Sequence, residues 1–418
     1  ETVRVSGLYL SSYQSGINEL TDIIMTEIEA VTDPSVQPGN EIWYTSTDGQ
    51  IVTPFKADAF GVTIVSNTYV NGKGVISFDG VVTQIGHSAF YGCLNLASIE
   101  LPITVRTISS QAFERTGLES FHVPSENIYI GQAFAFCSQL SSFSGAYASM
   151  DGRMLVISDQ VVSFAPAGLT EYAVPAGVTS IGPNSFQGAQ LLSVTLPDGL
   201  LRISIRAFED CTRLESIHIP STVTAIEDFV FMDCESLTSI NIPASVQVLG
   251  DPFARCRQLA TFEGPFATSD HHALIFNGAL KGFALGAGLS EYTIPYGVRE
   301  VGAFVFHQAR LNKITIPDTV EIVGWYGFNA CGVSELVLPA RLRSISVGAF
   351  RNNALKTITF LAVNPPTAHD GDRILDDTMN CPIFVPSESV DAYKIAEGWK
   401  NYADRIFPLE EPALPVPE

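Results

Sequence analysis

This sequence has few basic residues for its number of acidic ones, and it has no long hydrophobic run. Its 418 residues include 23 lysines and arginines against 44 aspartates and glutamates, a formal net charge of −21. This excess of negative charge argues against nucleic acid or an anionic membrane as a partner. No stretch approaches the roughly 20 apolar residues of a membrane-spanning helix. We therefore expect no nucleic-acid binding and no membrane insertion.

Motifs for catalysis and metal binding are also missing. The sequence contains no G-x-S-x-G, H-E-x-x-H or Walker motif and no C-x-x-C pair. His271 and His272 follow Asp270, but adjacent side chains point apart, so an exposed turn is the preferred interpretation. An acidic loop lacks the spacing of an EF-hand; its carboxylates are Asp370, Asp372, Asp376 and Asp377. We expect a protein without enzymatic activity, cofactor or metal.

The chain does contain an internal sequence repeat that recurs many times. Leu214–Cys234, LESIHIPSTVTAIEDFVFMDC, has near-copies on both sides. A phenylalanine recurs in these copies every 21 to 23 residues, apart from two gaps of 52 and 53 residues. The phenylalanines are Phe90, Phe113, Phe134, Phe186, Phe208, Phe231, Phe253, Phe306, Phe328 and Phe350.

Two further markers keep the same register. Three positions after each phenylalanine stands a small or thiol residue: Cys93, Thr116, Cys137, Ala189, Cys211, Cys234, Cys256, Ala309, Cys331 and Asn353. An apolar residue followed by proline ends the L-x-x-I-x-I run of most copies, as at Pro220. A period of this length with such a run is typical of leucine-rich-repeat solenoids.

Each copy predicts one coil of the solenoid. Alternation places Ile217 and Ile219 on the buried face of a strand and Ser216 and His218 on the other face. Pro220 then ends this strand because proline lacks the N–H that a ladder needs. Val223 to Ile226 predicts a second short strand, and the Phe231 segment predicts a tight helical turn.

The pattern I-x-I-P-x-x-V-x-x-I-x-x-x-A-F-x-x-C-x-x-L resembles the BspA-like leucine-rich-repeat family over roughly residues 75 to 405. Members are surface and secreted proteins of host-associated anaerobic bacteria. The resemblance implies a leucine-rich-repeat solenoid, mainly β with short helical turns. It also implies an extracellular or cell-surface location. We expect a processed start at Glu1, with any signal or lipoprotein anchor outside these residues.

Six of the seven cysteines fall in the repeat column, and Cys381 stands apart. Neighbouring coils lie about 4.8 Å apart, so distance alone leaves a bridge such as Cys211 to Cys234 open. Column neighbours point in parallel, however, and alanine or threonine fills the same position elsewhere. Buried, reduced cysteines that pack in the core are therefore the preferred interpretation.

The repeat divides the chain into four parts. We expect an N-terminal cap with degenerate first coils at 1–74, the solenoid at 75–386, a helical C-terminal cap at 387–407 and a proline-rich extended tail at 408–418. Glu19–Val31 fits an amphipathic helix, which we expect to cover the open end; a helix that binds a partner is the alternative. Ala59–Phe60 echoes the repeat, and Ile76–Phe78 matches a strand position.

The C-terminal cap is predicted to begin with a helix near Ser387, a residue that favours a helix N-cap. Four residues supply the apolar side that seals the last coil: Val390, Tyr393, Ile395 and Trp399.

The two doubled gaps, 142–175 and 261–295, contain one module used twice. Each lacks the phenylalanine turn and has two apolar runs around a turn, such as Ala273–Phe276 and Leu280–Phe283. Asn277–Gly278 is a strong signal for a two-residue β-hairpin. Each module therefore predicts a coil with a β-hairpin inserted on its convex side.

Two surfaces are candidates for binding. The hairpins either close a wider coil or present aromatic anchors to a partner, namely Tyr147, Phe164, Phe266 and Phe283. The open strand face, expected to be concave, is small and polar. It is either solvated or binds an extended polar ligand through Ser193, Thr195, Ser216, His218, Ser239 and Asn241.

We expect a monomeric, non-enzymatic interaction protein that engages a host extracellular protein or a glycan. A structural spacer without a ligand of its own is the first alternative. A glycan-active enzyme is the second, since a catalytic carboxylate pair meets only in space.

Overall fold

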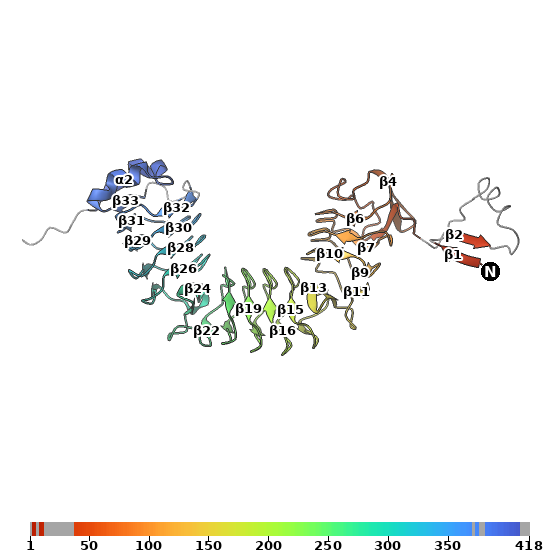
Figure 1. Cartoon of the computed structure of the whole chain (residues 1–418), viewed down its shortest axis with the longest axis horizontal. Coiled ribbons are helices and arrows are strands. Elements are labelled where there is room, and N and C mark those ends of the chain that lie inside the picture. Colours follow the sequence, from red (N-terminus) through yellow and green to blue (C-terminus); the bar gives the residue numbers. More distant parts are fainter. Residues whose placement is uncertain (1, 6–7, 12–36, 370–372, 376–380, 410–418) are drawn as a thin grey trace, which may run out of the picture.

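The structure is a computed structural model that describes residues 2–5, 8–11, 37–369, 373–375 and 381–409. It is a β-solenoid of about 14 turns that curves into a U-shaped arc (Figure 1). Outside the arc, β1 (Thr2–Val5) pairs with β2 (Leu8–Ser11) in an antiparallel hairpin. Within the described ranges, no helix is long and apolar enough to cross a bilayer. The predicted fold class is confirmed.

Two columns of strands run along the arc, and most neighbours within a column pair in parallel. The first ladder comprises β7 (Leu96–Glu100), β9 (Ser120–Val123), β11 (Ser142–Gly145), β14 (Glu171–Ala173), β16 (Ser193–Thr195), β18 (Ser216–His218), β20 (Ser239–Asn241), β22 (Thr261–Glu263), β25 (Glu291–Thr293), β27 (Lys313–Thr315), β29 (Glu335–Leu338), β31 (Thr357–Phe360) and β33 (Ile383–Val385).

The second ladder is built from the shorter V-x-x-I run of each copy. It comprises β6 (Gln84–Ile85), β8 (Thr107–Ile108), β10 (Tyr129–Ile130), β13 (Gln160–Phe164), β15 (Ser180–Ile181), β17 (Arg202–Ile203), β19 (Ala225–Ile226), β21 (Val248–Leu249), β24 (Ala279–Phe283), β26 (Glu300–Val301), β28 (Ile322–Val323), β30 (Ser344–Ile345) and β32 (Thr367–Ala368). A turn joins the two strands of a coil, as where the Val223 N–H donates to the Pro220 carbonyl (3.1 Å).

The third side of each coil outside the hairpin modules is a tight turn that carries the repeat phenylalanine, and we call this side the turn column. Phe231 is fully buried and stacks on Phe208 and Phe253, with ring centroids 5.8 and 5.7 Å away. The Phe231 N–H donates to the Pro252 carbonyl of the next coil (2.9 Å). The phenylalanine column is therefore both the core and part of the bonding between coils.

Five of the six repeat cysteines are buried donors within this core. The thiols of Cys137, Cys211, Cys234 and Cys256 donate hydrogen bonds of 3.0 to 3.2 Å to the carbonyl of the repeat phenylalanine one coil earlier. Asn353 Nδ2 makes the same contact to Phe328 (2.6 Å). All seven cysteines are free thiols, and all except the half-buried Cys93 are buried. The predicted packing role is confirmed for five of the six column cysteines, Cys137, Cys211, Cys234, Cys256 and Cys331, whereas Cys93 is only half-buried.

The two predicted hairpins are present. β12 (Met154–Ile157) pairs antiparallel with β13, and β23 (Ala273–Phe276) pairs antiparallel with β24. Asn277 and Gly278 connect the second hairpin with φ values of 50° and 80°, as a turn of type I′ requires. Each hairpin gives the second ladder one strand more than an ordinary coil does.

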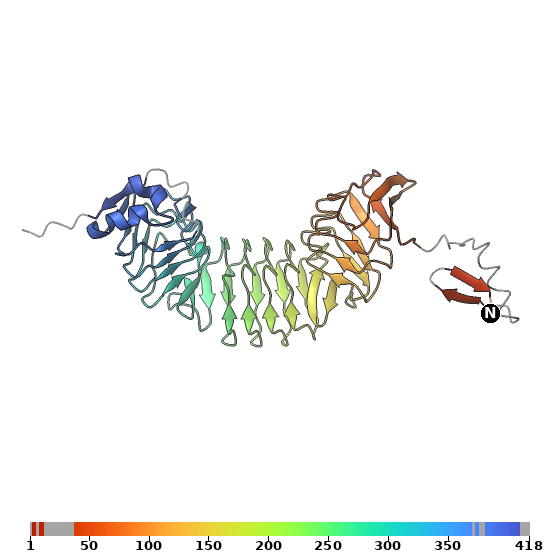
Figure 2. The ribbon, with the colours of Figure 1, turned by 45° about the horizontal axis from the view of Figure 1, so that its top comes forward.

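Each hairpin module also bends the array. Because the module has no phenylalanine turn, the turns before and after it meet: the Phe136 N–H donates to the Gln187 carbonyl (3.2 Å), and Arg257 Nη2 donates to Gln308 Oε1 (3.2 Å). The turn column is thus shorter and the second ladder longer at each module, so the arc bends toward the turn column. Two bends divide the solenoid into three blocks (Figure 2).

This geometry confirms that the hairpins lie on the convex side. It corrects the expectation for the strand face, which does not line the inside of the arc because the turns do.

The N-terminal cap differs from the expected degenerate coils. β3 (Glu41–Ser46), β4 (Ile64–Val70) and β5 (Lys73–Phe78) form an antiparallel sheet in the order β4-β5-β3-β7. Thus β3, not Ile76–Phe78, lies beside β7, and its antiparallel direction ends the parallel ladder. Phe60 does continue the phenylalanine column, 5.7 Å from Phe90. Glu19–Val31 lies outside the described residues.

The C-terminal cap consists of η3 (Ser387–Ser389), α2 (Val390–Ile395), η4 (Lys400–Arg405) and β34 (Ile406–Pro408). Tyr393 and Trp399 are fully buried, and Val390 packs at the edge of the core as expected. Ile395 is 79% exposed, so its predicted role was wrong. The Ser387 hydroxyl makes no capping bond and donates to Leu409 instead (3.2 Å).

The chain then returns to the sheet, because β34 pairs in parallel with β33 and becomes the last strand. Pro408 therefore belongs to this strand rather than to a tail, and 410–418 lie outside the described residues.

Candidate functional site

The outer surface of the first ladder, which we call the strand face, carries the predicted polar residues. β16 pairs with β18, so Ser193 lies beside Ser216 and Thr195 lies beside His218. Ser193 is half-buried, whereas the other three side chains are exposed. On each strand the middle residue points inward, as Ile217 between Ser216 and His218 does with 7% of its surface exposed. The alternation read from the sequence is therefore the observed one.

Ser239 and Asn241 continue this face on β20, but in a separate sheet. β20 pairs with β22, which places Ser239 beside Thr261 and Asn241 beside Glu263. β18 and β20 are consecutive in the stack without a shared ladder. The six predicted residues are thus brought to one face, and the face is divided between two sheets.

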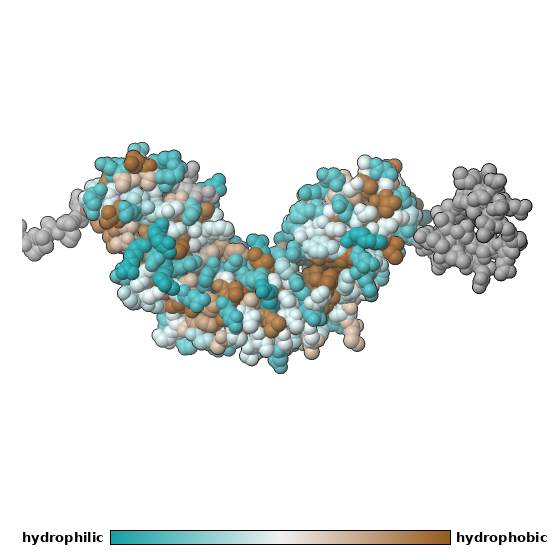
Figure 3. Space-filling view, viewed as in Figure 1, coloured by the Kyte–Doolittle hydropathy of each residue, from teal (hydrophilic) through white to brown (hydrophobic). Residues whose placement is uncertain are grey.

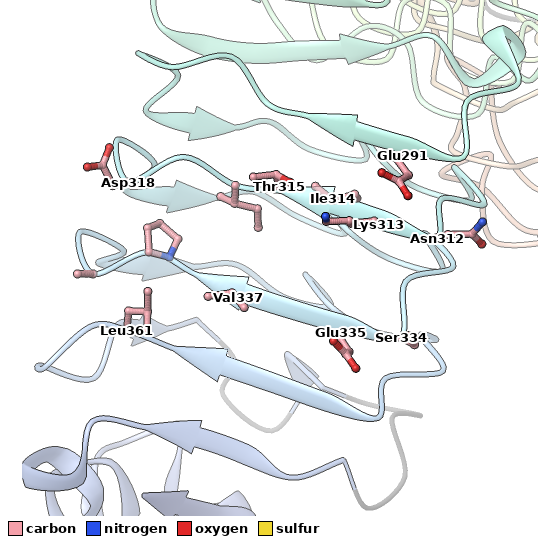
Figure 4. A pocket seen from close by; sticks show the side chains of 13 residues that line it. Glu291, Asn312, Lys313, Ile314, Thr315, Asp318, Ser334, Glu335, Val337 and Leu361 are labelled. Atoms are coloured by element: carbon pink, nitrogen blue, oxygen red, sulfur yellow. The ribbon is translucent and has the colours of Figure 1, made fainter. Parts of the chain in front are cut away.

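A hollow of about 660 Å³ opens farther along the same face, between β27 and β29 (Figure 4). The two strands do not pair with each other, because β27 pairs with β25 and β29 pairs with β31. We call this opening the strand-face hollow. Its lining includes Glu291, Lys313, Thr315, Glu335, Val337 and Leu361.

The strand-face hollow is charged at one end and more apolar at the other, where Asp318 also lies (Figure 4). Glu291 and Lys313 are register neighbours on β25 and β27, and both side chains are exposed. Lys313 forms no ion pair with any residue that the structure describes. Val337 and Leu361, which are 52% and 37% exposed, lie away from Glu335 (Figure 4). The hollow can therefore accept an apolar side chain next to a charged or hydrogen-bonding group.

Sequence reasoning missed the strand-face hollow. A signal was present, because Lys313 and Glu335 occupy the column in which earlier coils have Ser193, Ser216 and Ser239. The change from serine to charged residues marks where the face changes character. The missing ladder between β27 and β29 has no comparable marker in the sequence.

The hairpin aromatics divide into two kinds. Phe164 and Phe283 are each only 3% exposed, and their rings lie 4.4 Å from Phe186 and 4.9 Å from Phe306. They fill the phenylalanine column where the turn is missing, so the interpretation that they face a partner was wrong.

Tyr147 and Phe266 remain half-buried near the surface. The Tyr147 hydroxyl donates to the Glu126 carbonyl, and the Phe266 ring packs edge-on against Phe276, 5.0 Å away. Their role in binding stays a prediction.

The residues considered for metal binding do not converge. His271 Nδ1 lies 3.0 Å from the Phe262 carbonyl, while His272 Nδ1 faces Asp270 at 3.7 Å. Among the described residues, no group of three or more histidines, cysteines or carboxylates is placed to hold a metal. The acidic loop carboxylates Asp370, Asp372, Asp376 and Asp377 lie outside the described residues.

Several solved structures of bacterial proteins are similar to this chain. A leucine rich cell surface protein of Faecalibacterium prausnitzii is 24% identical, with a TM-score of 0.41 over 56% of this chain and 57% of that one. The chain thus covers little more than half of that protein's length. A leucine-rich repeat protein of Bacteroides ovatus is 22% identical, with a TM-score of 0.38 over 84% and 92%. The pneumococcal vaccine antigen PcpA is 15% identical, with a TM-score of 0.39 over 84% and 89%.

A search of curated proteins found no match. The family model described as BspA type leucine rich repeat region matches residues 66–148, 160–281 and 279–364, with six copies. These ranges contain well over half of the chain and all three blocks of the arc. The chain belongs to the BspA-type leucine-rich-repeat family.

Proposed function

We propose that this chain is a non-enzymatic, secreted or cell-surface interaction protein whose strand face holds an extended segment of a host extracellular protein. The observation that carries the proposal is the strand-face hollow at one end of a long exposed row of hydroxyl, imidazole and amide side chains. An extended ligand lying across the parallel strands meets side chains of the same kind from coil to coil. Many modest hydrogen bonds then combine with one apolar anchor in the hollow.

The negative charge of the strand face favours one kind of partner segment over another. The strand face has exposed glutamates on five of its strands, at Glu100, Glu171, Glu263, Glu291 and Glu335. The whole chain has a net charge of −21. A neutral or basic segment is favoured over an acidic one because complementary charge speeds association and excludes like-charged partners.

Most of the face that Figure 3 shows is less suited to a large hydrophobic partner. Teal and pale residues cover most of this view, and brown residues form small groups, most clearly beside the right-hand bend. Isolated exposed apolar residues are ordinary on soluble proteins, whereas a contiguous patch would indicate an interface. This distribution favours recognition through polar contacts with a local anchor.

A binding screen tests the proposal. The purified chain is applied to an array of extracellular-matrix proteins and glycans, next to three variants. The first carries Thr195→Ala, His218→Ala and Asn241→Ala; the second carries Leu361→Glu in the hollow; the third has both hairpins shortened to turns as a control. We expect binding to a matrix protein that the first two variants lose and the hairpin variant keeps.

Three outcomes contradict the proposal. Loss with the hairpin variant alone moves recognition to Tyr147 and Phe266. No binding at all favours a structural spacer. Turnover of a glycan on the array indicates an enzyme.

A further inference from the structure

The inner corner of the first bend contains a second hollow, of about 400 Å³, which we call the corner pocket. It lies in the turn column, on a different side of the coil from the strand face. Turns from before the hairpin module supply Ser110, Gln111 and Gln132, and turns from after it supply Gln187 and Asp210. The pocket exists only because the module brings these two sets of turns together.

The walls of the corner pocket are held in place. The Phe136 N–H bonds to the Gln187 carbonyl across the bend (3.2 Å). Gly188, at a φ of 77°, abuts the Phe136 ring so closely that a Cβ there would lie 2.4 Å from it. Glycine is therefore required at 188, and the two blocks meet in one arrangement.

Two arginines stand at the pocket with their guanidinium groups oriented by aromatic rings. The Arg115 guanidinium lies 4.1 Å from the centre of the Phe136 ring, and that of Arg206 lies 5.6 Å from the Phe229 ring. Their nearest carboxylates, Glu114 and Glu209, are 3.7 Å away, beyond ordinary hydrogen-bond distance. Guanidinium N–H groups therefore remain for a ligand.

Side-chain amides add donors whose orientation is fixed. Gln132 Oε1 accepts a hydrogen bond from the Ser110 hydroxyl (2.9 Å), and Gln111 Oε1 accepts a weaker one from Ser88 (3.4 Å). Each bond directs the amide nitrogen of the glutamine away from its partner. Within the described part of the chain, neither nitrogen donates a hydrogen bond, and the Asp210 carboxylate accepts none.

We propose that the corner pocket binds a neutral saccharide. Its arginines are balanced by Glu114 and Asp210, so the pocket has no strong preference for charge of either sign. Hydroxyl groups both donate and accept hydrogen bonds, which matches a lining of amide donors, guanidinium donors and carboxylate acceptors. The volume lies within the roughly 300 to 1,000 Å³ that is typical of small-molecule sites. This inference is independent of the function proposed for the strand face.

Saturation-transfer NMR and calorimetry test the inference on the full chain. The ligands are glucose, galactose, mannose, N-acetylglucosamine and their common disaccharides, with glucuronate and inorganic sulfate as anionic probes. The variants are Gln132→Ala and Asp210→Asn. Arg202→Ala, an exposed arginine of the second ladder, is the matched control, and circular dichroism confirms that each variant is folded.

We expect at least one neutral saccharide to bind, a tenfold or larger loss of affinity in either pocket variant, and no change in the control. Gln111→Ala replaces any pocket variant that does not fold. The inference is overturned if no neutral saccharide binds or if only the anionic probes bind. It is also overturned if the pocket variants bind like the wild type, which would place a saccharide elsewhere on the chain.

Discussion

Phe231→Ala tests the core most sharply, because Phe231 is fully buried in the middle of the central block. The substitution removes a ring that stacks on Phe208 and Phe253 at 5.8 and 5.7 Å. Its neighbours are held by backbone bonds on both sides, such as that from the Phe231 N–H to Pro252, so the cavity cannot close easily. Truncation of a buried phenylalanine in such a site costs about 3 to 5 kcal/mol.

The assay is urea unfolding followed by far-ultraviolet circular dichroism, with the midpoint and slope compared between variant and wild type. Phe55→Ala is the matched control, since the Phe55 side chain is 62% exposed, and we expect it to change stability by less than about 1 kcal/mol. A loss below about 1 kcal/mol for Phe231→Ala would refute the stacked column as the main source of stability.

Three further predictions follow from the same structure. Burial raises the pKa of Glu209 from 4.5 to about 7, so the folded state holds a proton that the unfolded state releases, and the free energy of unfolding falls as pH rises from about 4.5 through 7. Urea unfolding at several pH values should show that Glu209→Gln flattens this fall and raises the free energy of unfolding at pH 8 by on the order of 1 to 3 kcal/mol. Burial also raises the pKa of the Cys137 and Cys93 thiols to about 11, so a thiol reagent at pH 8 should label the native chain slowly and only at the half-buried Cys93. Cys93→Ser should abolish this labelling, and rapid reaction of several thiols would contradict the prediction. Gly278→Ala should lower the free energy of unfolding by about 1 to 2 kcal/mol, because Gly278 has a φ of 80° that a residue with a Cβ adopts only with strain. An unchanged melting temperature for this variant would contradict the prediction.

The sequence was sufficient for the repeating part of the fold. Phenylalanine, the small residue after it and the proline after most first-ladder strands recur at nearly fixed distances, and the phenylalanine is buried in every coil that has it. The hairpins were predictable to within about one residue because two apolar runs flank a short turn, most clearly at Asn277–Gly278. A local pattern repeated many times leaves little freedom for an alternative fold.

The ends and the sites were harder to predict because they depend on contacts between distant segments. β3 lies beside β7 and places Trp43 opposite Glu100, and no local sequence pattern indicates this pairing. For Phe164 and Phe283 the sequence left open whether they close a coil or face a partner, and only the structure shows that they fill the column positions that the missing turns leave vacant. The corner pocket needs turns on either side of a module to meet, as Phe136 and Gln187 do.

The most direct test of the central claim is hydrogen–deuterium exchange on the chain with and without a matrix protein identified in the binding screen. If the strand face is the recognition surface, binding should slow exchange in the first ladder around β16, β18, β27 and β29. Exchange in the turns around Phe136 and Gln187 should not change. Protection confined to the turns or the hairpins, with none in the first ladder, would contradict the account.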